Sequence, residues 1–127
     1  MTRRPGLAPI LAVSLAFLAA CVPDTSLPET CRDTSVEFTA TRADGRLDPV
    51  TFAACRDQAV TITIAVEQDG ILHLHGYDDL LSAQEVRAGE EAELSFAATH
   101  VGQFPIALHP QGGSSELTVG TLVVHDA

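Results

Sequence analysis

Two histidines stand two positions apart in the segment ILHLH (71–75), which is followed by a glycine, a tyrosine and two acids. Imidazole is the commonest metal ligand in proteins. If 71–75 is a strand, alternation places Ile71, His73 and His75 on one face. Next-but-one residues of a strand lie roughly 6.5–7 Å apart, so both imidazoles can lean onto one ion. The spacing therefore permits a metal site, which needs a third ligand from elsewhere.

The first twenty residues have the layout of an export signal. Arg3 and Arg4 precede the apolar run LAPILAVSLAFLAA, which is shorter than the roughly 20 apolar residues of a membrane span. The run ends in LAAC, which resembles the lipobox of bacterial lipoproteins. We therefore expect a lipoprotein signal peptide at 1–20, a lipid on Cys21, and an extracytoplasmic protein anchored to a bacterial membrane, on the periplasmic side or at the cell surface. The alternative is a soluble export with ordinary cleavage nearby.

The 107 residues that remain amount to about one domain and are strongly acidic. Loss of Arg3 and Arg4 moves the formal net charge from −10 to −12, and the chain contains no lysine. Nucleic acids and anionic lipids require clustered cations, so we expect neither as a partner. Contact with the membrane would then depend on the lipid at Cys21.

Cys31 and Cys55 are the other two cysteines, an even number for an oxidising compartment. We expect a disulfide closing a loop of about 25 residues, which would stabilise the domain by roughly 3 kcal/mol. The alternative is two free thiols that bind metal. The segment VPDTSLPET (22–30) is polar and contains two prolines, so residues 21–33 are predicted to tether a domain at 34–127.

Short strand patterns recur at spacings of about 8–12 residues. The clearest is AVTITIAVE (59–67), in which aliphatic residues alternate with threonines. Similar runs occupy 36–40, 50–55, 71–75, 83–87, 92–98, 102–108 and 116–124. Turn residues separate these runs, and no segment holds a helical period. The sequence therefore predicts an all-β sandwich or barrel of about seven to eight strands.

The order of the motifs resembles that of the cupredoxin-like domains of secreted bacterial proteins. The motifs are HGY at a strand end, then RAGEEAELSF, GQFPIALH and GTLVV. The resemblance covers about 34–124 and implies a Greek-key β-sandwich. It also implies that the strand with the first histidine and the closing loop meet at one end of the sandwich.

Blue-copper cupredoxins bind copper through a first histidine and through a cysteine, a histidine and a methionine of the closing loop. By this resemblance, His75 matches the first histidine and His109 falls near the cysteine position. No cysteine follows Cys55 and no methionine follows Met1. A thiolate is what makes a blue-copper site, so we expect no blue-copper electron transfer.

The candidate ligands that remain are three histidines and two acids: His73, His75, His109, Asp78 and Asp79. Imidazole and carboxylate suit Cu(II) or another divalent metal such as Zn(II). Tyr77 is expected to cover such a site while its hydroxyl stays in water. The alternative is a metal-free interaction or envelope module, with His75 a hydrogen-bonded rim residue and His109 an ordinary loop residue.

Other classes of function find less support. Cupins also carry two histidines with an acid a few residues later, but no second cupin motif surrounds His109. The serines lie in no nucleophile motif, and the glycine-rich PQGGSSE (110–116) precedes no helix that could cradle a phosphate. We therefore expect no enzyme. His100 is expected to be a surface-turn residue, and His125 a tail residue without a role.

Overall fold

The computed structural model describes Thr2, Gly6, residues 27–113 and residues 115–127. Most of the predicted signal peptide at 1–20 and the predicted lipidation site Cys21 lie outside these residues. So does the first half of the predicted tether. Across the described part of the chain, no helix has the length and apolar character needed to span a membrane.

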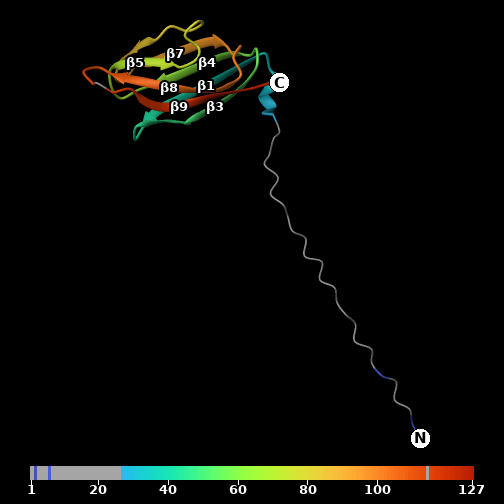
Figure 1. Cartoon of the computed structure of the whole chain (residues 1–127). Helices are drawn as coiled ribbons and strands as arrows, with labels where there is room; N and C mark the ends of the chain where they lie inside the picture. The colour runs from blue at the N-terminus through green and yellow to red at the C-terminus, as the bar shows by residue number, and fades with distance from the viewer. Residues whose placement is uncertain (1, 3–5, 7–26, 114) are drawn as a thin grey trace.

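The described residues form nine strands and one short 3-10 helix. They are η1 (Glu29–Arg32), β1 (Ser35–Ala43), β2 (Arg46–Asp48), β3 (Thr51–Cys55), β4 (Ala59–Ala65), β5 (Gly70–Leu74), β6 (Gln84–Val86), β7 (Glu91–Ala97), β8 (Gly102–Pro110) and β9 (Leu117–His125). One sheet has the order β2-β1-β4-β7, and the other has the order β3-β9-β8-β5-β6. The two sheets stack as a sandwich (Figure 1). The predicted all-β sandwich is confirmed.

Eight of the nine strands coincide with predicted runs, and β2 is the addition. Its three residues are too few to show an alternating pattern, and Pro49 follows them directly. β2 forms because Asp44 and Gly45, with φ of 54° and 81°, make a tight turn that folds it back onto β1. Two positive φ angles are typical of the two-residue hairpin turn whose twist matches that of the strands.

The core lies between the two sheets and is built from alternate residues of each strand. β4 buries Val60, Ile62 and Ile64, and its threonines lie on the opposite face. β5 follows the same rule: Leu72 and Leu74 are fully buried in the core. His73, the residue between these leucines, therefore points away from the core, onto the outer face of the five-stranded sheet.

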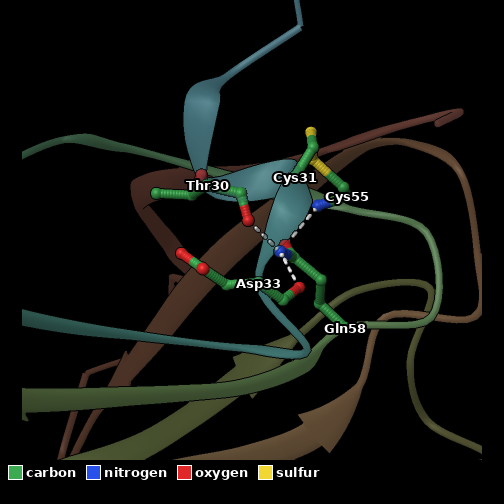
Figure 2. Close-up of a disulfide and its surroundings, with 5 residues drawn as sticks. All are labelled: Thr30, Cys31, Asp33, Cys55 and Gln58. Atoms are coloured by element: carbon green, nitrogen blue, oxygen red, sulfur yellow. Dashed lines mark hydrogen bonds between the residues drawn. A yellow bond between two sulfur atoms is a disulfide. The ribbon is translucent and has the colours of Figure 1, made fainter.

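The disulfide between Cys31 and Cys55 is present, which confirms that prediction. It joins η1 to the end of β3, with the two Cα atoms 5.3 Å apart (Figure 2). The buried side chain of Gln58 completes the junction: its Nε2 donates to the carbonyls of Thr30 and Asp33, and its Oε1 accepts from the amide of Cys55. The segment before β1 is thus fixed to one end of the sandwich, beside the C-terminus (Figure 1).

Replacing both Cys31 and Cys55 with serine should lower the free energy of unfolding of the full chain by about 3 kcal/mol, because the unfolded chain regains the entropy of an open loop. Urea unfolding followed by circular dichroism measures the change, and the wild-type chain under reducing conditions is the matched control. A midpoint equal to that of the oxidised wild type would contradict this account.

Candidate functional site

The β5–β8 ladder brings predicted ligands from distant parts of the sequence onto one face. In this antiparallel pair Ile71 stands opposite His109, and His73 stands opposite Ala107. Directly opposite residues share a face, so His73 and His109 both project from the outer side of the five-stranded sheet. His75 follows β5 and extends the ladder by donating its backbone N–H to the carbonyl of Pro105, at 3.0 Å.

The three predicted histidines belong to one continuous chain of side-chain contacts. His73 Nε2 contacts Asp78 Oδ1, and the ring centroids of His73 and His75 lie 4.4 Å apart. His75 Nε2 contacts Glu116 Oε1, and His109 Nε2 lies 3.3 Å from Glu116 Oε2. We call these five residues the histidine cluster. The structure thus brings together all three predicted ligands and one of the two predicted acids.

The small residue Ala107 lies beneath the histidine cluster, on the same face of the sheet. Ala107 stands opposite His73 and so belongs to the outer face, yet it is fully buried. It is not a member of the core between the sheets. The side chains above it on the outer face must therefore cover it. A larger residue at this position would occupy space among the histidines.

The histidine cluster is half-exposed, and its acids are held in the ionised form. The exposed fractions of the His73, His75 and His109 side chains are 22%, 39% and 46%. The hydrogen bond from His73 lowers the pKa of Asp78, and the hydrogen bond from His75 lowers the pKa of Glu116, in each case against a smaller opposing effect of burial. Nearby imidazolium charge lowers both further. Both carboxylates are therefore available to attract a cation.

The side chains as they stand do not converge on one point. Among residues 27–113 and 115–127, no group of three or more His, Cys, Asp or Glu side chains has the arrangement of a metal site. His73 faces Asp78, whereas His75 and His109 face Glu116. For all three imidazoles to hold one ion, His73 would have to leave Asp78. The atoms that the histidine cluster offers to a metal are imidazole nitrogens and carboxylate oxygens.

Glu116 is the member that the sequence did not single out. It lies just before β9, and its neighbour Leu117 pairs with Leu108 across the β8–β9 hairpin. That register brings Glu116 beside His109. The signal was available in principle, because a hairpin between 102–108 and 116–124 places the residues that flank its loop next to each other.

Tyr77 is not the water-facing lid that we expected. The residue is fully buried, and its hydroxyl donates to the carbonyl of His100 at 2.7 Å and accepts from the amide of His100 at 3.1 Å. Its ring packs against Phe96 and Phe104, with both centroids 4.9 Å away. Burial raises the pKa of the Tyr77 hydroxyl. The prediction was wrong because the β7–β8 loop supplies both hydrogen-bond partners that a buried hydroxyl needs.

Asp79 and His100 form a second pair outside the histidine cluster. His100 Nε2 lies 3.1 Å and 3.2 Å from the two carboxylate oxygens of Asp79. The Asp79 carboxylate therefore pairs with His100 rather than with the predicted ligands. His100 is the partner of both Tyr77 and Asp79, which ties the loop after β5 to the loop before β8.

Comparison with known proteins identifies the fold. No family model and no curated protein matches the chain. The multicopper oxidase mgLAC matches with a TM-score of 0.56 and 15% identity, over 72% of this chain and 39% of its own. A copper binding protein solved in the apo form by NMR matches with a TM-score of 0.57 and 14% identity, over 73% of this chain and 90% of its own.

Auracyanin A, a "blue" copper protein from the green thermophilic photosynthetic bacterium Chloroflexus aurantiacus, matches with a TM-score of 0.54 and 16% identity. That match covers 72% of this chain and 99% of auracyanin A. The chain thus spans well under half of the oxidase but nearly the whole of the two smaller proteins. Identities this low establish the fold alone, and the fold is cupredoxin-like.

Replacing Tyr77 with phenylalanine should lower the free energy of unfolding by about 1–3 kcal/mol, because the amide and carbonyl of His100 lose their partner in a largely buried place. Urea unfolding of the full chain, followed by circular dichroism, measures the loss. Ser95→Ala is the matched control, since it removes a hydroxyl whose hydrogen bonds are exposed and should change little. Equal effects of the two substitutions would refute the anchoring role of Tyr77.

Proposed function

We propose that this protein is a lipid-anchored, extracytoplasmic domain that binds Cu(II), or another divalent metal, through His73, His75 and His109. The observation that carries the proposal is the shared carboxylate of Glu116, which His75 and His109 contact while the ring of His73 lies beside that of His75. Three imidazoles and a carboxylate from two neighbouring strands and a hairpin form a donor set that suits Cu(II) or Zn(II).

Asp78 would compete with the metal for His73 and is not proposed as a ligand. Its carboxylate contacts Nε2 of His73, so this nitrogen would have to leave Asp78 before it could bind the same ion as His75 and His109. The released carboxylate would remain near the site as a negative charge. The negative net charge of the chain favours the approach of a cation to the protein.

The structural neighbours favour copper among the divalent ions. Auracyanin A and the copper binding protein are both copper proteins by name, and each aligns over nearly its whole length. The site proposed here differs from a thiolate site in its donors. Cys31 and Cys55 are joined to each other, and the histidine cluster supplies only imidazole and carboxylate. We accordingly propose a binding domain, with neither blue-copper electron transfer nor catalysis.

A metal-free interaction or envelope module is the second candidate. It is favoured by the present pairing of each cluster imidazole with a carboxylate, which satisfies these side chains without an ion. Ile71 and Leu80 are exposed apolar residues on and after β5, and could contact a partner. Under this reading the histidine cluster stabilises the outer face and nothing more.

The two candidates differ in a metal titration. The full chain, with Cys21→Ser so that no thiol outside the Cys31–Cys55 disulfide can bind metal, should bind one Cu(II) per molecule with weak visible absorption, because intense blue colour requires a thiolate. Binding should weaken by at least about 10–100-fold in His75→Ala, the loss typical of perturbed metal sites. His125→Ala is the matched control, because His125 lies at the other end of β9, opposite Cys55.

Binding should also weaken at acid pH, because protons compete with the metal for the lone pairs of the imidazole nitrogens. Circular dichroism should show that His75→Ala remains folded, because this half-exposed side chain contributes little to the core. Absence of Cu(II) and Zn(II) binding in the parent chain would eliminate the metal-site proposal and leave the metal-free module.

Anchoring is tested by cell fractionation in a bacterial host that processes lipoproteins. The wild-type chain should be recovered with membranes, and Cys21→Ser should be recovered in a soluble fraction or as an uncleaved precursor. Mass spectrometry of the membrane form should show a chain that begins at residue 21 and carries acyl groups. A wild-type chain in the soluble fraction with an unmodified N-terminus would refute the anchor.

A further inference from the structure

We infer that Glu116 is itself a metal ligand, and that it makes the site selective for oxidised copper, Cu(II), over Cu(I). This inference rests on the proposed function and names the ion state that the same site takes. It begins from one feature of the histidine cluster: within the described residues, Glu116 is the acid that contacts two histidines. Its two oxygens face different imidazoles, Oε1 toward His75 and Oε2 toward His109.

The β8–β9 hairpin fixes the backbone position of Glu116. Leu117, the residue after Glu116, pairs with Leu108, so the backbone of Glu116 leads directly into the β9 ladder. At the other side of the loop, the amide of Gln111 donates to the carbonyl of Asp69 at 2.9 Å, and the amide of Gly113 donates to the carbonyl of Pro110 at 3.1 Å. Both ends of the loop are therefore held. A carboxylate placed in this way loses little entropy when it binds an ion.

An ion held by His75 and His109 would meet a Glu116 oxygen as well. Each Nε2 atom contacts an oxygen of this carboxylate directly, so an ion bound by both nitrogens would take the place of these contacts, next to the carboxylate. The Glu116 side chain is 36% exposed and that of Asp78 is 62% exposed, so water screens the charge of Glu116 less than that of Asp78. The carboxylate that now satisfies two imidazoles would thus become a ligand beside them.

The chemistry of the ligand atoms then determines whether Cu(I) or Cu(II) binds more tightly. Cu(I) prefers soft thiolate and thioether sulfur, whereas Cu(II) accepts imidazole and carboxylate in tetragonal sites. The Coulomb energy of a carboxylate with a divalent ion is also twice that with a monovalent ion at the same distance. Removing the charge of Glu116 must therefore weaken Cu(II) binding more than Cu(I) binding.

Asp78 supplies a matched comparison on the same face. It is a carboxylate in the same cluster, but it contacts a single imidazole and its side chain is 62% exposed. Removing its charge changes the local electrostatic field without removing a proposed ligand. Glu93, on the outer face of β7 in the other sheet, is the distant control of equal charge and side-chain length to Glu116.

The experiment measures affinity for Cu(II) and for Ag(I), a redox-inert stand-in for Cu(I), in the full chain carrying Cys21→Ser. Glu116→Gln should weaken Cu(II) binding by more than about 10–100-fold, the range typical of losing a group that only supports a ligand. Its effect on Ag(I) should be much smaller. Asp78→Asn should weaken Cu(II) binding less than Glu116→Gln does, and Glu93→Gln should change neither ion.

Electron paramagnetic resonance of bound Cu(II) gives a second readout, because Glu116→Gln should change the spectrum of the site whereas Glu93→Gln should not. Unchanged Cu(II) affinity in Glu116→Gln, or equal losses for Cu(II) and Ag(I), would overturn the inference while leaving a histidine metal site in place. A parent chain that binds neither ion would overturn the proposed function together with this inference.

Discussion

The antiparallel pairing of β5 with β8 is the constraint on which the candidate site depends. It sets Ile71 against His109 and His73 against Ala107, and the hydrophobic core holds this register because Leu72 and Leu108 form a fully buried pair. A slip of one residue would turn the histidines into the core and the leucines into water. The packing energy of the sandwich therefore keeps the imidazoles on the outer face, where an ion could reach them.

The segment after β5 is organised by a tight turn at Gly76 and by the buried ring of Tyr77. Gly76 has a φ of 86°, and a Cβ at this position would meet the ring of Phe104 at 2.5 Å, so the tight turn there requires glycine. The turn buries Tyr77 in the core, and the two acids that follow point to different partners: Asp78 to His73 and Asp79 to His100. Two adjacent acids thus contact two histidines that lie far apart in the sequence.

Local periodicity predicted eight of the nine strands and the shared face of His73 and His75, and the even number of cysteines left after Cys21 predicted the pairing of Cys31 with Cys55. The sequence did not predict what depends on contacts between loops. Glu116 was missed because its place beside His109 follows from hairpin register, and the burial of Tyr77 was missed because its partners belong to a loop more than twenty residues away. Alternation specifies the face of a strand, but the partners of loop residues depend on tertiary packing.

The most direct test of the account is a count of the imidazole nitrogens bound to Cu(II) in the full chain with Cys21→Ser, by pulsed electron paramagnetic resonance. The account predicts coupling to three imidazoles, reduced to two in His73→Ala, since that histidine must leave Asp78 to join the site. A single histidine, or a Cu(II) signal that is indistinguishable between the parent and His73→Ala, would contradict a site built on the outer face of β5 and β8.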